Sequence, residues 1–451
     1  MINNSPQRLG TAPVGKLLLE YSIPAIIAMT VVSLYNVIDS IFIGHGVGAM
    51  AIAGLAITFP LMNLIIAFCT LVGVGSATIS SIYMGQKDHK RATSVLHHAT
   101  ILLAFNGVLL TVVTLIFLDP ILRFFGASDD TLPYARDFMQ VILVANPIAY
   151  LFVGLNNMMR ATGYPRKAML SSFLTVAVNI VLAPIFIFLL KWGIRGAALA
   201  TVTAQITGLI WVLSHFFNRN SYICFKRGYF SLQRRIVVSI LGIGLSPFLM
   251  NTCACVVVII INTSLLSHGG NMAIGAYGIV NRMMTLFVMV VLGLAQGMQP
   301  IVGYNYGAKR YDRVRQALLY GVFWGGCITA TGTLFNELMP GTIVGFFTSD
   351  PELLEISRSG LRIMSAAFAI VGIQIVITQF FQSIGKSRIS IFLSLSRQLL
   401  FLIPCLLLLP PVYGTDGVWW SIPLSDVVSF TLSVLALWYH LRKMSSHPAA
   451  E

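Results

Sequence analysis

The first half of the chain contains the stretch Met50–Arg91, MAIAGLAITFPLMNLIIAFCTLVGVGSATISSIYMGQKDHKR, and the second half contains a diverged copy, Met272–Arg313, MAIGAYGIVNRMMTLFVMVVLGLAQGMQPIVGYNYGAKRYDR. The two stretches align without a gap, 222 residues apart, with identities at Met50/Met272, Ala51/Ala273, Ile52/Ile274, Ile57/Ile279, Met62/Met284, Leu64/Leu286, Gly75/Gly297, Ile79/Ile301, Gly85/Gly307, Lys87/Lys309 and Arg91/Arg313. Apolar matches alone arise easily in a hydrophobic chain, but Gly, Lys and Arg in one register do not. The stretch therefore predicts two homologous halves.

The repeat extends beyond this stretch in nearly the same register. Pro24 meets Pro247, Gly163 meets Gly385, Arg166 meets Arg388, and Gly193-Ile-Arg-Gly196 meets Gly414-Thr-Asp-Gly417. The expected organisation is an N-terminal lobe over residues 1–225, a basic cytoplasmic linker over 226–235 and a C-terminal lobe over 236–451.

The composition places the chain in a membrane. Of its 451 residues 57% are hydrophobic and 10% are charged, and the mean hydropathy is +0.83. Soluble domains carry about 25% charged residues, so a water-soluble enzyme, a nucleic-acid binder and a disordered chain are excluded. Apolar runs long enough to span a bilayer lie near 17–44, 50–84, 94–118, 134–158, 165–190, 196–217, 236–266, 271–306, 316–338, 353–384, 388–412 and 417–441.

The charges of the loops support these twelve spans. With the N-terminus in the cytoplasm, most of the 29 Lys and Arg residues fall on the inner side, whereas Asp119, Asp129, Asp130, Asp350 and Asp416 fall outside. Positive charge gathers on cytoplasmic loops, so both termini are expected in the cytoplasm of a bacterial inner membrane. Six spans per half make both halves enter from the same side, and their pseudo-twofold axis then lies along the membrane normal. The fold class is all-α, with two six-helix lobes.

The sequence shows no sign of an enzyme or an ATP-driven motor. No phosphate loop, HExxH or GxSxG pattern occurs. The eight His residues are scattered, mostly near span ends, where interfacial positions explain them. Transport by this chain is expected to draw its energy from an ion gradient, with no cofactor besides the coupling ion, H⁺ or Na⁺.

A few charged side chains fall inside the spans. A charge at the bilayer centre costs roughly 2.5–3.5 kcal/mol on insertion scales, so Asp39 in the first span needs a reason. The functional interpretation is a carboxylate that binds the coupling ion; the structural one is a hydrogen bond between helices, which a neutral Asn provides more cheaply. Asn179 and Thr201 are candidate partners. Their oxygens suit Na⁺ and equally a protonatable network.

Other intramembrane residues have weaker interpretations. Arg397 and Asp426 are expected to form a polar pair in the C-terminal lobe, most simply structural, and Arg282 has no obvious partner. Pro24 is expected to bend the helix that carries Asp39. A further set of apolar residues has two interpretations: they line a pliable substrate cleft, or they make ordinary contacts with the core or with lipid. These residues are Met158, Met283, Met284, Phe287 and Met298.

Several motifs together resemble the MATE family of multidrug and toxic compound extrusion transporters, in its prokaryotic DinF/MepA-like branch. They are Ser22-Ile-Pro24, Ile38-Asp-Ser-Ile-Phe-Ile-Gly44, Gly193-Ile-Arg-Gly-Ala-Ala-Leu-Ala-Thr201, Gln299-Pro-Ile-Val-Gly-Tyr-Asn-Tyr-Gly-Ala-Lys309, Gly417-Val-Trp-Trp and Pro423-Leu-Ser-Asp426. The resemblance covers nearly the whole chain. It implies export of cationic, often aromatic drugs in exchange for H⁺ or Na⁺, with an N-lobe ion site that includes Asp39, Asn179 and Thr201 and a bend at Pro24.

One position departs from the branch. The branch commonly has an Asp four residues after this Asn, but the stretch here reads Asn179-Ile-Val-Leu-Ala183-Pro184. Positions 179 and 183 share a helix face, so Ala183 removes a carboxylate from the same pocket. Either Asp39 serves alone or the sequence is a neutralised variant, and the case for Na⁺ weakens because Na⁺ loses a ligand.

The expected function is ion-coupled antiport that removes drugs and other xenobiotics by alternating access. The alternative is a flippase for lipids or lipid-linked oligosaccharides, which would favour a cationic central cleft to bind phosphate. Apart from Arg282 and Arg397, intramembrane cations are absent from the sequence, which counts against it. Expected partners are drug-like small molecules and the bilayer, with no nucleic acid, and the chain is expected to be a monomer.

Overall fold

The structure is a computed structural model that describes residues 7–219, 221–226, 228–229, 231–348 and 350–445, with the side chains of 36, 37, 40, 44, 49 and 443–445 left aside. The described part is helical, with no strand. It divides into two compact units: the described residues of Met1–Thr11 with Ile27–Phe248, and Ala12–Ile26 with the described residues of Leu249–Glu451. Two helices, α2 (Val14–Gly46) and α10 (Arg234–Gly307), contribute to both units.

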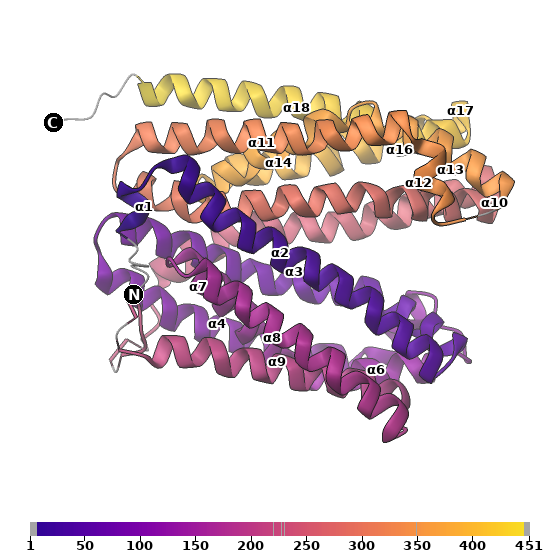
Figure 1. The fold of residues 1–451 in the computed structure, drawn as a ribbon, viewed down its shortest axis with the longest axis horizontal. Coiled ribbons are helices and arrows are strands. Elements are labelled where there is room, and N and C mark those ends of the chain that lie inside the picture. The colour runs from indigo at the N-terminus through magenta and orange to yellow at the C-terminus, as the bar shows by residue number, and fades with distance from the viewer. Residues whose placement is uncertain (1–6, 220, 227, 230, 349, 446–451) are drawn as a thin grey trace. The chain divides into compact units, whose positions relative to one another are not determined.

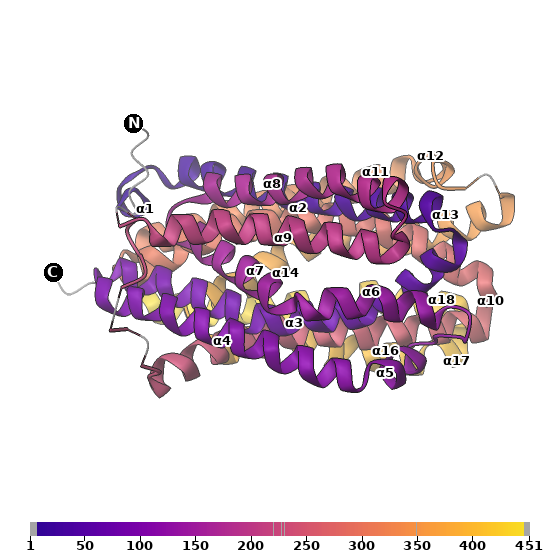
Figure 2. The same cartoon turned by 90° about the horizontal axis from the view of Figure 1, so that it is seen from below.

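The first unit is a bundle of long helices. Besides part of α2 and the start of α10 it contains α1 (Arg8–Thr11), α3 (Ala49–Gly85), α4 (His89–Ile116), α5 (Leu118–Phe124), α6 (Leu132–Val144), α7 (Asn146–Ala161), α8 (Pro165–Pro184), the π-helix η1 (Ile185–Leu189) and α9 (Gly193–Phe217). Within it α8 and α9 run side by side (Figure 2). Proline lacks an N–H and disturbs the hydrogen bonds of the preceding turn, and α8 passes into η1 directly after Pro184.

The second unit repeats this plan. It contains the rest of α10, α11 (Tyr311–Leu338), α12 (Pro340–Gly345), α13 (Pro351–Ser365), α14 (Phe368–Ser383), α15 (Ser387–Leu395), the π-helix η2 (Ser396–Leu402), α16 (Ile403–Leu408), α17 (Pro410–Tyr413) and α18 (Thr415–Ser445). In this unit α11 and α14 lie side by side (Figure 1). A core of Tyr277, Leu361, Phe368 and Trp419, among others, fills its interior.

The helices account for the twelve expected spans. Nine described helices are long and apolar enough to cross a membrane, and two bent pairs, α6 with α7 and α13 with α14, bring the number to eleven. The 74-residue α10 is interrupted at Gly270, whose φ of 67° and ψ of −163° are not helical. Because the break falls between the runs expected near 236–266 and 271–306, α10 supplies two spans.

The compact units differ from the sequence halves at their first helices. Both crossings directly follow a proline, since α2 changes unit between Ile26 and Ile27, two residues after Pro24, and α10 changes between Phe248 and Leu249, just after Pro247. The residues of α2 before Ile27 therefore pack in the second unit, and the residues of α10 before Leu249 pack in the first unit.

Glycines explain why these segments pack where they do. In the first unit Gly244 of α10 lies against the backbone of Leu71 in α3, so closely that an added Cβ would overlap the Leu71 carbonyl. In the second unit Gly297 of α10 also lies close to the backbone of Ser22 in α2, whose Oγ donates to the Leu294 carbonyl at 3.3 Å. Small residues let helix backbones approach closely in a membrane.

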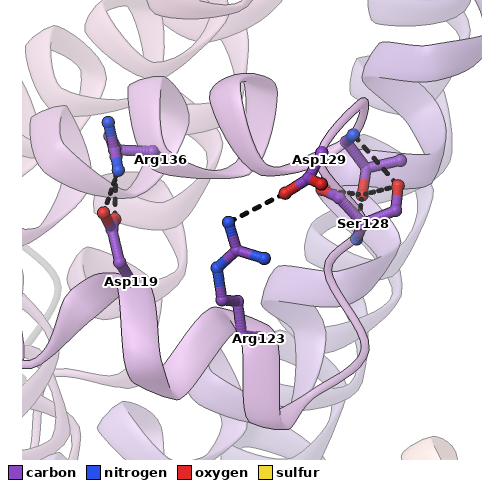
Figure 3. A network of polar contacts seen from close by, with 6 residues as sticks. Asp119, Arg123, Ser128, Asp129 and Arg136 are labelled. Carbon is purple, nitrogen blue, oxygen red and sulfur yellow. Dashed lines mark hydrogen bonds and ion pairs between the residues drawn. The ribbon is translucent and has the colours of Figure 1, made fainter.

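Ion pairs connect α5, α6, α9 and the loop after α5 within the first unit. Arg136 of α6 forms a bidentate pair with Asp119 of α5, and Arg123 Nη2 donates to Asp129 Oδ1 at 2.8 Å (Figure 3). Arg195 of α9 donates to Asp137 at 2.7 Å. These side chains are largely solvent-accessible, so each pair contributes only about 0.2–1 kcal/mol.

Candidate functional site

Three helices of the first unit bring polar side chains together. Asn179 of α8 donates from Nδ2 to the Tyr35 hydroxyl of α2 at 3.2 Å and to Thr201 Oγ1 of α9 at 3.1 Å, and the two hydroxyls are 3.0 Å apart. The close approach of α9 follows from its buried small residues, Ala197, Ala200, Ala204 and Gly208.

The hydrogen bonds of this network satisfy one another. Thr201 donates its proton to the Ala197 carbonyl at 3.2 Å, so its oxygen accepts from Asn179 and from Tyr35. Tyr35 then donates to Thr201 and accepts from Asn179. The Tyr35–Asn179–Thr201 network is neutral. We call it closed because each of its hydroxyl and side-chain amide protons already has an acceptor.

Asp39 lies four residues after Tyr35, one helical turn away on the same face of α2. Its side chain is buried, with 8% of the residue exposed, and among the described residues its Oδ1 has no hydrogen-bond partner. A buried charge ordinarily needs a partner. This carboxylate is therefore the open group beside a closed network, available to a proton or a cation.

The position one turn after Asn179 on α8 carries no second carboxylate. Ala183 lies one turn after Asn179 and is fully buried, so the α8 side of this site carries one amide and no carboxylate. Within the described residues, no group of three or more His, Cys, Asp or Glu side chains is arranged to hold a metal ion. Any cation here relies on Asp39 together with neutral oxygens.

The second unit buries a different acid in a different way. Asp426 of α18 is 2% exposed and accepts from Arg397 Nε at 2.7 Å, an ion pair that crosses from α18 to η2. Gln398 follows Arg397 in the sequence, and Ser429 lies about one helical turn after Asp426. Gln398 Oε1 and Ser429 Oγ are buried without a hydrogen-bond partner among the described residues. The charge of Asp426 is compensated inside the protein, unlike that of Asp39.

The candidate cleft residues lie in the packing of their units. Met158 and Met298 have no exposed surface, and Met284 belongs to the core of the second unit. Met283 and Phe287 are half-buried and pack against that same core. These positions fit the core interpretation that the sequence left open.

The structure thus brings Asn179 and Thr201 into contact and places Asp39 one turn from that contact. Sequence reasoning missed Tyr35, although its spacing of four residues from Asp39 was a usable signal. Pro24 is buried in a helix that continues through it and lies two residues before the change of unit.

Comparison with known proteins identifies the family. The model of the MatE family matches residues 24–185 and 247–407, so one family model fits both halves of the chain, in the register of the repeat. "Multidrug export protein MepA" of Staphylococcus haemolyticus is 28% identical over 433 residues, covering 95% of this chain and 94% of the relative. The protein of that name in Staphylococcus aureus is 26% identical over 435 residues, covering 96% and 95%.

Solved structures of MATE transporters also resemble the chain over nearly its whole length. "Crystal structure of MATE in the bent conformation" matches with a TM-score of 0.93 and 25% identity, and an outward-facing multidrug resistance MATE family transporter of the MOP superfamily matches with 0.91 and 26%; each covers 98% of both chains. The predicted family and the predicted two-lobed helical fold are confirmed. The chain belongs to the MatE family of membrane transporters and is not an enzyme.

Proposed function

We propose that the protein exports drug-like organic cations across a bacterial inner membrane in exchange for protons, with Asp39 as the coupling carboxylate. The multidrug names of its relatives support the substrate class. The observation that carries the coupling role is the state of Asp39, a buried carboxylate whose Oδ1 has no partner among the described residues.

The donor set favours a proton over Na⁺. A proton needs one carboxylate oxygen, whereas hard cations take several oxygen ligands. The Thr201 oxygen already accepts two hydrogen bonds and the Tyr35 oxygen one, and Ala183 supplies no second carboxylate. To gain the Thr201 oxygen as a ligand, Na⁺ would have to displace the hydrogen bonds that this oxygen accepts from Asn179 and Tyr35.

In this proposal α2 couples ion binding to the conformational change. This helix carries Asp39 in the first unit and its initial segment packs in the second unit, with Pro24 two residues before the change. Protonation removes the charge of Asp39 and so alters which arrangement of α2 is favoured. Alternating access then follows if proton and drug prefer different arrangements, and the coupling cannot exceed their differential affinities.

The flippase alternative finds less support. It needs free cations in the membrane to bind phosphate, but Arg397 is paired with Asp426. Arg282 is exposed on α10, as a single cation. No observation favours this function over drug export.

The test is efflux of a cationic dye from proteoliposomes under an imposed pH gradient or an imposed Na⁺ gradient. The chain is expected to export on the pH gradient alone, and Asp39→Asn is expected to reduce export to the level of empty vesicles. Asp129→Asn, which removes an exposed carboxylate of the same unit, is the matched control and is expected to export normally. Wild-type export by Asp39→Asn would overturn the coupling role.

A second comparison tests the departure at position 183. If Asp39 suffices, Ala183→Asp is not needed for export, and it shifts the ion preference toward Na⁺ by adding a ligand. Export that appears only after Ala183→Asp would contradict coupling by Asp39 alone and assign the coupling site to a pair of carboxylates.

A further inference from the structure

The segment between α9 and α10 joins the two halves, and its described residues belong to the first unit. Its beginning is held by apolar contact, since Ile223 and Cys224 are buried. The backbone N–H of Phe225 donates to the Phe216 carbonyl at 2.9 Å, and the Phe225 ring packs on Phe217. Residues 226–233 follow, and they end where α10 begins.

Two adjacent histidines of α4 hold the rest of this segment. His97 and His98 are 0% and 1% exposed, although they are polar. The backbone N–H of Lys226 donates to His97 Nε2 at 3.2 Å, and the backbone N–H of Gln233 donates to His98 Nε2 at 2.7 Å. Both ends of residues 226–233 are therefore fixed to neighbouring imidazoles.

The other nitrogen of each ring determines its protonation state. His97 Nδ1 lies 2.9 Å from the Thr93 carbonyl, and His98 Nδ1 lies 2.7 Å from the Ser94 carbonyl. A carbonyl can only accept, so each Nδ1 carries the proton, and a backbone N–H can only donate, so each Nε2 is bare. Both contacts require the neutral imidazole in one tautomer.

We propose that His97 and His98 form a pH-sensitive latch, which holds Lys226 and Gln233 against α4 while both imidazoles are neutral and releases them when the imidazoles are protonated. An added proton converts Nε2 from an acceptor into a donor that faces another donor. Histidine is the side chain that ordinarily makes this change between about pH 5 and 8. Release also frees the start of α10, which follows Gln233 directly.

The described contacts of the two imidazoles include no carboxylate. Tyr229 of the segment stacks on His97 with ring centroids 5.6 Å apart. Among the described residues, the other titratable or charged side chains on the segment and on the helices around the pair include Lys226, Arg234, Arg235, His89, Lys90, Arg91, Tyr83, Lys87, Asp88, Arg160 and His215. Asp88 is the one carboxylate among these, and it pairs with Arg91 at 3.4 Å. A proton on the latch thus adds to a positive environment.

His89 provides an internal contrast on the same helix. Its Nε2 lies 3.0 Å from the Tyr222 hydroxyl, and their rings are in contact. A hydroxyl can both donate and accept, so this contact persists when His89 gains a proton. The latch therefore depends on what the histidine faces: a backbone N–H at His97 and His98, but a hydroxyl at His89.

Hydrogen–deuterium exchange of the purified protein in lipid nanodiscs tests the latch without relying on transport. Between about pH 7.5 and about pH 5.5, after correction for intrinsic exchange, peptides spanning 226–233 are expected to lose about tenfold in protection. In the His97→Gln/His98→Gln variant the amide oxygens still accept the two N–H groups but do not titrate, so the loss is expected to stay below about twofold. His89→Gln, the matched control, is expected to respond like the wild type.

The opposite results would overturn the latch. Equal protection of the wild type at both pH values would do so, as would an unchanged response in the double glutamine variant. If that variant does not fold, the wild-type profile still decides: loss confined to residues 226–233 supports the latch, and loss spread along α4 and α9 contradicts it. Asp39→Asn is expected to keep the response, so a failure of the proposed coupling is distinguished from a failure of the latch.

Discussion

Both units bury a carboxylate within the membrane, but they treat its charge in opposite ways. Asp426 in the second unit forms an ion pair with Arg397 at 2.7 Å. Asp39 in the first unit has a buried oxygen with no partner among the described residues, beside a neutral network that is already closed. A compensated charge is already held by its partner, whereas an uncompensated one is available to an ion. This contrast is the reason we propose the coupling site in the first unit.

The difference is not inherited from the repeat. In the register of the repeat Asp39 aligns with Asn262, and the Tyr35–Asn179–Thr201 network aligns with Val258, Phe401 and Ile422. In the other direction, Arg397 and Asp426 align with Thr175 and Gln205. The two halves thus share the plan of their helices, while each has its own buried polar groups.

Breaking the ion pair is expected to have the largest effect on stability. Arg397→Met leaves the Asp426 carboxylate buried and uncompensated, which costs about 3–5 kcal/mol of unfolding free energy. Asp39→Asn removes a carboxylate that lacks a partner, so it is expected to change this free energy by less than about 1 kcal/mol. Denaturation in mixed micelles measures both variants on one scale.

A double substitution separates the pair from its surroundings. Arg397→Met/Asp426→Leu removes both charges, and buried pairs replaced by apolar residues are often neutral or stabilising, so it is expected to recover most of the loss. Equal losses for Arg397→Met and Asp39→Asn would contradict the contrast between the two units.

The glycine contacts test how closely α10 packs in each unit, at a smaller magnitude. Gly244→Ala in the first unit and Gly297→Ala in the second both place a methyl group against a facing backbone, and overpacking of this kind costs about 1–3 kcal/mol. Gly242→Ala is the matched control, because an added Cβ there meets nothing within 4 Å. Thermal unfolding of the three variants gives the comparison. A harmless Gly244→Ala would mean that α3 and α10 can separate without loss.

These cases show what sequence predicts and what it leaves to the structure. The twelve spans and the repeat follow from hydropathy and register, because each span must be apolar along its own length. The exchange of first-helix segments does not, because it depends on which backbones Gly244 and Gly297 meet. Asn179 and Thr201 were candidates as polar residues of other spans, and the family resemblance supported them. Tyr35 was missed because a tyrosine in an apolar span is ordinary until its partner, 144 residues away, is known. The burial of His97 and His98 was likewise invisible among eight scattered histidines.

The smallest expected effect sharpens the contrast inside the first unit. Tyr35→Phe removes one hydroxyl from a neutral network, and interhelical hydrogen bonds in membranes average about 0.6 kcal/mol, so the unfolding free energy is expected to fall by roughly that amount. Tyr439→Phe, at an exposed position of α18, is the control. Because the hydroxyl only holds helices around Asp39, efflux on a pH gradient is expected to persist in Tyr35→Phe while Asp39→Asn loses it. Equal loss of efflux in both variants would mean that the proton is shared with Tyr35, and the closed network would then be part of the ion site.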